Sequence, residues 1–297
     1  METALQNIFG MYFIMMAAYF LKRISPYPVE VVNNLVFNFF LPVTIFYSMV
    51  EPQKSHLSEF TELAISGFVI IFLTYVLAVI VVRPLHLKES FKRTFLLGSS
   101  YGNHAFLGFP VAYAFLGNNG VVLAIFYLIG GYFFLYIIGL YIMTGKMTLS
   151  SLFKNPLVIA MIAGMLCIIL RLQLPPLLTY SLSLMNKATF PLAMVVVGGG
   201  LSLKFFVKSS NIIYTFIVSF IKLILSPLIA FALGLAFSLS SDQLAISILQ
   251  SAMPAAVLVT VFSVKYEGDD VFSNSIVSLT TLASIGTIPL LFLLLRY

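Results

Sequence analysis

Long runs of apolar residues recur from one end of the chain to the other, and they constrain its fold more than any other feature. About twenty apolar residues suffice for a helix to cross the hydrocarbon core of a bilayer. The sequence contains ten such segments, at about residues 7–23, 31–50, 62–82, 92–117, 120–144, 156–172, 176–202, 211–238, 242–265 and 270–295. Charged residues make up 9% of the chain, against roughly a quarter in soluble domains. We therefore predict an all-α polytopic membrane protein with one membrane domain over residues 1–297.

The distribution of Lys and Arg predicts the orientation of these segments. Cytoplasmic connections of membrane proteins are enriched in Lys and Arg. With the N-terminus outside, eleven such residues fall in inner connections and three in outer ones. The inner residues are Lys22, Arg23, Arg83, Lys88, Lys92, Arg93, Lys146, Lys154, Lys204, Lys208 and Lys265, and the outer ones are Lys54, Arg171 and Arg296. Both termini are thus expected outside. Because the basic residues are dispersed among membrane connections, the expected large partner is the lipid bilayer and not a nucleic acid.

Two of the predicted spans carry poor helix formers at their centres. In the fourth span the segment "LLGSSYGNHA" (96–105) places Gly102 and Asn103 at mid-membrane, and in the ninth "ILQSAMPAAV" (248–257) places Pro254 there. Backbone groups freed by such breaks are tolerated at that depth where protein or a water-filled cavity satisfies them. Paired broken helices in corresponding positions are a sequence indication of a transporter's substrate site.

The two halves of the chain resemble each other in the placing of these breaks. Aligned on their centres, the two segments share a leucine at 97/249, a serine at 99/251 and a helix breaker at 102/254. Each half also carries an Asn-to-Pro segment, "NNLVFNFFLP" (33–42) and "NKATFP" (186–191). Five spans per half with opposite orientations predict an inverted repeat, with repeat one at about 1–145 and repeat two at about 150–297.

The breaks also indicate the kind of ligand. The second half of each broken helix would present its N-terminal N–H groups at mid-membrane, and this partially positive end favours an anion. Candidate substrate-binding residues are those at the breaks and two polar residues preceding Pro42 and Pro191: Gly102, Asn103, His104, Met253, Pro254, Ala255, Asn38 and Lys187. Lys187 either meets an anionic substrate or forms a structural pair. Lys222, in the eighth span, is expected to extend toward the membrane surface.

Several function classes lack the residues they need. The middle of the predicted spans carries no Asp or Glu, which disfavours a proton pump or cation antiporter built on a buried carboxylate. No His, Cys and carboxylate set has metal-ligand spacing, so neither a metal nor another cofactor is expected. Two alternatives to a carrier stay open. One is a ligand-binding membrane sensor or receptor, and the other is a membrane-embedded enzyme that uses His104 as a base.

Several of these segments together resemble the auxin efflux carrier family, which includes the plant PIN-FORMED carriers and bacterial organic-acid permeases. The resemblance covers nearly the whole chain. It rests on "NNLVFNFFLPVTIF" (33–46), "SSYGNHAFLGFPV" (99–111), "NPLVIAMIAGM" (155–165), "LPPLL" (174–178), "FPLAMVVVGGGLSL" (190–203) and "SAMPAAVLVTVFSVKYEGD" (251–269). Within these, Asn103 matches the family's crossover Asn, and Gly108 and Pro110 match its Gly-x-Pro.

The resemblance implies an elevator-type fold of ten helices in which spans four and nine cross at their broken segments. It further implies a scaffold of spans 1, 2, 6 and 7, a mobile transport part of spans 3–5 and 8–10, and a homodimer formed through the scaffold. This chain has Gly102 where plant members carry proline, and Ala255 where they carry a polar amide. The expected function is therefore secondary transport or facilitation of a small organic anion, not auxin, across a bacterial inner membrane, and not an enzymatic reaction.

Overall fold

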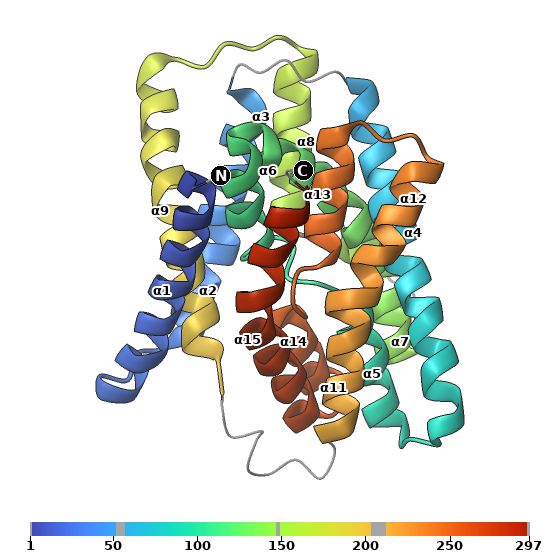
Figure 1. The fold of residues 1–297 in the computed structure, drawn as a ribbon. Coiled ribbons are helices and arrows are strands. Elements are labelled where there is room, and N and C mark those ends of the chain that lie inside the picture. The colour runs from blue at the N-terminus through green and yellow to red at the C-terminus, as the bar shows by residue number, and fades with distance from the viewer. Residues whose placement is uncertain (1, 52–56, 147–148, 203–211, 296–297) are drawn as a thin grey trace.

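The structure is a computed structural model that describes residues 2–51, 57–146, 149–202 and 212–295, and these ranges are almost entirely helical. Lys54, Lys204, Lys208 and Arg296, counted in the orientation argument, lie outside them. The α-helices are α1 (Glu2–Ile24), α2 (Val29–Leu35), α3 (Leu41–Val50), α4 (Leu57–Val82), α5 (Glu89–Ser100), α6 (Gly108–Phe134), α7 (Leu140–Thr144), α8 (Pro156–Ile169), α9 (Pro176–Gly200), α11 (Ile212–Phe220), α12 (Ser226–Ala236), α13 (Ser241–Ser251), α14 (Val257–Lys265) and α15 (Asp270–Leu295) (Figure 1).

Six helical stretches within the described ranges are long and apolar enough to cross a membrane. They are Val29–Val50, Thr61–Leu85, Gly108–Thr144, Pro176–Gly200, Ile212–Ala236 and Asp270–Leu295. This supports the prediction of an all-α polytopic membrane protein. The count of ten spans and the inverted repeat stay predictions.

The long stretch Gly108–Thr144 is not one straight helix. Leu116 and Gly117 have non-helical backbone angles, and Gly117 adopts a φ of 62°, which glycine reaches without strain. A Cβ at Gly120 would collide with the carbonyl oxygen of Ala112, although eight residues of straight helix would separate the two by roughly 12 Å. The chain therefore turns back on itself at Gly117, close to the boundary predicted between spans four and five.

Short π-helical turns precede two prolines inside the membrane segments. The turn η1 (Val36–Phe40) leads into α3, whose second residue is Pro42, and η5 (Ile221–Leu225) leads into α12, whose second residue is Pro227. Proline clashes with the carbonyl four residues earlier in a regular helix, and a π turn widens the helix at that place. The local sequence thus explains why each helix is distorted where it is.

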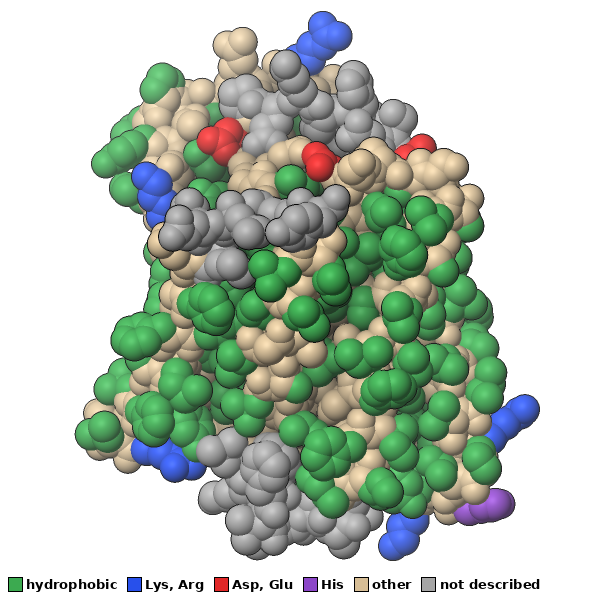
Figure 2. Space-filling model, viewed as in Figure 1, with side chains coloured by type: hydrophobic (Ala, Val, Ile, Leu, Met, Phe, Trp, Pro, Cys, Tyr) green, Lys and Arg blue, Asp and Glu red, His purple; other side chains and the backbone are tan. Residues whose placement is uncertain are grey.

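The helices pack in two groups around the broken segments. α1, α2, α3, α8 and α9 contact one another, whereas α4 packs on α5, α6 and α12, and α13 packs on α6 and α12. In Figure 1 the ends of α1 and α9 and the α4–α5 and α14–α15 junctions lie toward the lower end of the molecule, while α1 begins and α15 ends toward the upper end. Figure 2 shows a broad hydrophobic belt, with charged side chains near the two ends, as membrane immersion requires.

Candidate functional site

Two helices are interrupted where the sequence predicts it, and the interruptions are bonded to each other. α5 ends at Ser100 and α6 begins at Gly108, while α13 ends at Ser251 and α14 begins at Val257. The Asn103 N–H donates to the Pro254 carbonyl at 2.7 Å, and the Ala256 N–H donates to the Tyr101 carbonyl at 3.2 Å. Gly102 and Ala255 form an antiparallel bridge between them. Each break therefore supplies the backbone partners that the other needs.

Two further hydrogen bonds satisfy backbone groups of the crossing. The Gly108 N–H, at the start of α6, donates to the Asn103 carbonyl at 3.0 Å. The Ala255 N–H donates to the Thr280 hydroxyl on α15 at 3.1 Å. The crossing is thus held by the two breaks themselves and by a third helix.

A cavity of about 200 Å³ lies beside the crossing. Its lining residues come from α2 with η1, the first break, α6 and the start of α14. They are Asn33, Asn34, Phe37, Tyr101, Gly102, Asn103, His104, Ala105, Phe106, Leu128, Tyr132, Ala256, Val257, Leu258 and Val261. No side chain caps the N-terminus of α14, whose first two residues are in this wall. The first N–H groups of a helix lack intrahelical partners, so this wall carries a partial positive charge.

Asn103 and His104 are buried at the cavity, with 4% and 1% of their surface exposed. The Asn103 side-chain amide makes no hydrogen bond to the described residues, although the backbone of the same residue makes two. The His104 Nε2 accepts from the Gly102 N–H at 3.2 Å, while its Nδ1 has no partner within the described ranges. Asn103 therefore keeps its full side-chain bonding capacity for a ligand, and His104 is fixed in orientation.

Lys222 reaches the crossing from η5, contrary to the expectation that it extends to the membrane surface. Its side chain is fully buried, and its Nζ donates to the Ser251 carbonyl at 2.8 Å, at the end of α13. A Cβ at Gly102 would lie 3.0 Å from both Cε and Nζ of Lys222 and 2.9 Å from His104 Cε1. The absence of a side chain at Gly102 thus allows the ammonium group to approach the break.

The sequence does contain an indication that Lys222 is buried at mid-membrane. The span predicted at 211–238 has its middle near residue 224, so Lys222 is close to mid-membrane. An ionisable residue at that depth usually faces a polar interior and has a function. A lysine can extend to the interface only from near a helix end.

Gln250 and Tyr127 extend the polar surroundings of the break, and the sequence did not single them out as site residues. Both are fully buried, and neither their side-chain amide nor hydroxyl has a partner among the described residues. A Cβ at Gly108 would collide with Gln250 Oε1, and the Tyr127 ring centroid lies 5.3 Å from that of His104. Only the fold brings these residues to the first break.

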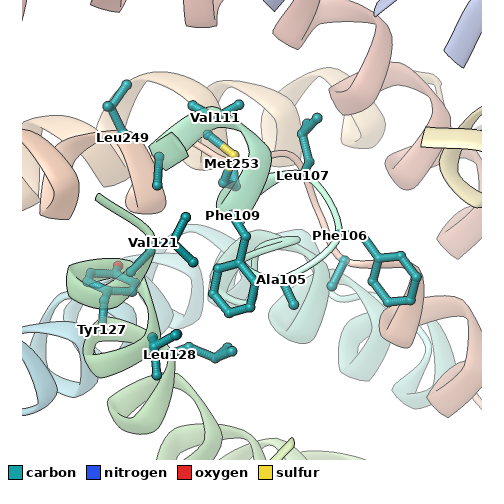
Figure 3. Close-up of a cluster of buried hydrophobic side chains, with 14 of the residues drawn as sticks. Ala105, Phe106, Leu107, Phe109, Val111, Val121, Tyr127, Leu128, Leu249 and Met253 are labelled. Carbon is teal, nitrogen blue, oxygen red and sulfur yellow. The ribbon is translucent and has the colours of Figure 1, made fainter. Parts of the chain in front are cut away.

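The three candidates at the second break have structural contacts. Met253 is fully buried in the hydrophobic cluster that includes Leu107, Phe109 and Val111 (Figure 3). The Pro254 carbonyl accepts the Asn103 N–H, and Ala255 forms the bridge to Gly102. These residues shape the crossing, and the cavity wall on this side is formed by the residues that follow them.

Asn38 and Lys187 lie away from the cavity, which corrects their placement among the candidates. Asn38 is exposed, and its amide donates to the Asn34 carbonyl of its own helix at 2.9 Å. Lys187 is exposed on α9 and has no ion pair with a described residue. Both residues precede a proline at corresponding places in the two halves, but the helix faces on which they lie turn them outward.

Comparison with known proteins identifies the family of this chain. The family described as "Membrane transport protein" matches residues 3–148 and 144–292. An uncharacterised transporter of Methanocaldococcus jannaschii is 30% identical over 272 residues, which cover 88% of each chain. The uncharacterised transporter YfdV of Escherichia coli K12 is 28% identical over 264 residues, or 82% of each chain. The family model matches both halves of the chain, and the chain therefore belongs to this membrane transport family of auxin efflux carriers.

Proposed function

We propose that this transporter is a secondary carrier or facilitator for a small organic anion, which binds at the crossing of the two broken helices. The observation that supports this proposal most directly is the positive electrostatic character of the crossing. The uncapped start of α14 lines the cavity, and the Lys222 ammonium approaches its wall at Gly102. No Asp or Glu lines this cavity. A carboxylate would be attracted by both groups and could accept a hydrogen bond from the Asn103 amide.

The size of the cavity favours a substrate of few atoms. Pockets for drug-sized ligands measure roughly 300–1,000 Å³, and this cavity measures about 200 Å³. Its walls combine aromatic rings, such as Tyr101 and Tyr132, with the amides of Asn33, Asn34 and Asn103. A short mono- or dicarboxylate matches this combination of size and chemistry.

Transport requires that the site open to each side of the membrane in turn. The helices α1, α2, α3, α8 and α9 pack mainly among themselves and meet the α4, α5, α6, α12 and α13 group where α1 and α3 contact α6. This division supports an elevator-type alternation between a scaffold and a transport part. We further propose a homodimer through the scaffold and an inner-membrane orientation with both termini outside. The Lys and Arg distribution supports this orientation.

The two other function classes lack comparable support. A sensor would bind the anion without moving it. An enzyme using His104 as base would need an unprotonated ring nitrogen that is free to accept a proton. Nε2 already accepts from the Gly102 N–H, which leaves the proton of the neutral ring on Nδ1. The described residues contain no group of three or more His, Cys, Asp and Glu side chains that could hold a metal ion.

Binding and flux measurements on the purified protein test the proposal. Acetate, lactate, succinate and benzoate are compared with their neutral amides by thermal shift, at a pH where the acids are ionised. Acids that raise the unfolding temperature more than their amides are then tested for uptake into proteoliposomes. Equal stabilisation by acid and amide would contradict an anion site, and binding without flux would favour the sensor.

A further inference from the structure

Lys222 is a fully buried ionisable group with unused bonding capacity. An ammonium group has three hydrogen-bond donors, and the Lys222 Nζ has one protein acceptor among the described residues, the Ser251 carbonyl. It forms no ion pair with any described side chain. The end of α13 contributes a partial negative charge, which stabilises the ammonium group in part. Two donors remain on a group that lies behind Gly102, and Gly102 itself lines the cavity.

The other charged groups of the neighbouring helices are far from Lys222. Its turn η5 packs against α4, α5, α11, α12 and α15, and its Nζ bonds the end of α13. The described charged side chains of these helices are Glu62, Glu89, Lys92, Arg93, Asp242 and Asp270, and α11 and α12 have none. Glu89, Asp242 and Asp270 each lie at least eight residues along their own helices from the crossing. Glu62 is hydrogen-bonded to Gln243 and so lies at its level, eight residues along α13 from Ser251. This separation corresponds to roughly 12–18 Å.

The phenols of the neighbouring helices do not supply a counter-charge either. Tyr75 on α4 packs its ring against Phe134, and Tyr214 on α11 packs against Phe91. Tyr101, in the first break, is fully buried beside His104. A phenol that is buried among apolar rings stays neutral, because ionising it would place an unpaired charge in a medium of low dielectric constant.

His104 is the nearest titratable group, and its hydrogen bond fixes it in the neutral form. Nε2 accepts from the Gly102 N–H, so the proton of the imidazole resides on Nδ1. A second proton on Nε2 would turn this acceptor into a donor facing another donor. It would also place a second positive charge beside Lys222. His104 therefore remains neutral while Lys222 gains or loses a proton.

We propose that Lys222 carries one proton with each substrate anion, so that the protein is a proton–anion symporter. The inference rests on the anion site of the proposed function. A charged ammonium in an empty site is a buried ion without a counter-ion, which is costly. Two states avoid this cost: a neutral amine with an empty site, and an ammonium with a bound carboxylate. The carrier reorients in these two states, and both have the same net charge at the crossing.

The proton balance of the cycle follows from these two states. On one side of the membrane the Lys222 amine takes up a proton from water as the carboxylate binds. After reorientation the carboxylate leaves, and the ammonium returns its proton to water on the other side. One anion and one proton cross together, without net charge transfer. Lys222 thereby performs the coupling role that a buried carboxylate has in other proton-coupled carriers.

Calorimetry of anion binding tests this coupling. Lactate and benzoate are titrated into the purified protein in buffers of different ionisation enthalpy, and the dependence of the heat on the buffer gives the protons taken up. We expect uptake approaching one proton per bound anion, and an affinity that falls about tenfold per pH unit once the empty site is deprotonated. Binding without proton uptake at any pH would overturn the proposal.

Three substitutions separate Lys222 from the other candidates. Lys222→Arg keeps a permanent positive charge, so it should bind the anion without proton uptake. Lys222→Met should abolish the uptake and weaken binding about tenfold, because it removes the positive charge beside the bound anion. Lys187→Met removes an exposed lysine and should match the wild type. Uptake that persists in Lys222→Arg would overturn the assignment, even if Lys222→Met fails to fold.

The two proposals fail in distinguishable ways. If none of the acids binds better than its amide, the anion site itself is refuted. If acids bind and cross the membrane but a pH gradient neither drives nor alters their flux in proteoliposomes, the anion site stands and the proton coupling is refuted. His104→Gln is the control for the other titratable group at the site. Proton uptake that is lost in this variant but kept in Lys222→Met would assign the proton to His104.

Discussion

The main-chain N–H of Asn103 donates a 2.7 Å hydrogen bond to the carbonyl oxygen of Pro254, which joins the interruptions of two separate helices. The chain is not helical at Pro254, so the carbonyl of this residue has no intrahelical partner, and here it serves as the acceptor for the other break. The same two residues thus explain how polar backbone persists deep inside the molecule and why the Asn103 side chain is held at the cavity wall.

Asn103→Ala should weaken anion binding by about tenfold. The side-chain amide has no described protein partner, so its loss removes a ligand contact worth about 1–1.5 kcal/mol and leaves the crossing intact. Binding is measured by calorimetry with the best acid of the panel. Asn38→Ala is the matched control, since that amide bonds only its own helix, and its affinity should be unchanged. Equal affinities in both variants would show that the Asn103 side chain does not contact the bound anion.

Gly102→Ala should destabilise the protein by about 1–3 kcal/mol, the usual cost of overpacking. The new methyl group would press on His104 Cε1 and on the Lys222 ammonium at 2.9–3.0 Å. Gly286→Ala, on α15, meets no atom within 4 Å and should be neutral or slightly stabilising, because alanine favours helix. Chemical denaturation in detergent compares the two. If both variants behave alike, the close approach of Lys222 to Gly102 does not matter for stability.

Thr280→Val should cost about 1–3 kcal/mol because it leaves the buried Ala255 N–H without its acceptor at 3.1 Å. Valine preserves the shape of threonine, so packing changes little. Thr179→Val provides the control, since its hydroxyl bonds an exposed carbonyl of its own helix end. The unfolding free energies of both variants are measured. A loss no larger for Thr280 than for Thr179 would show that the second break does not need α15.

Cysteine labelling of two exposed connections tests the orientation of the protein in the membrane. In a Cys167→Ser background, Gln173→Cys on the α8–α9 connection should react with a membrane-impermeant maleimide added outside intact cells. His86→Cys, between α4 and α5, should react only after the membrane is opened. The reverse labelling pattern would place both termini inside and invert the predicted topology.

The sequence alone determined the class of the protein and the place of its two breaks. Apolar runs of membrane-spanning length exclude a soluble fold whatever the tertiary contacts are. Gly102 and Pro254 interrupt helices for local steric reasons that need no knowledge of neighbours. The polar groups Asn103 and His104 follow the first break directly in the chain, so their position at the cavity could be predicted with it.

Tertiary structure decided which other residues join the site. Lys222 reaches Ser251 and Gly102 because a π turn and a missing side chain bring elements distant in sequence together. Asn38 and Lys187 have equally suggestive positions in the chain, yet their helices turn them outward. Periodicity tells which residues share one face of a helix, but it does not tell which face meets the crossing. That choice depends on how the helices pack around one another, because packing alone sets which buried polar groups can reach a common partner.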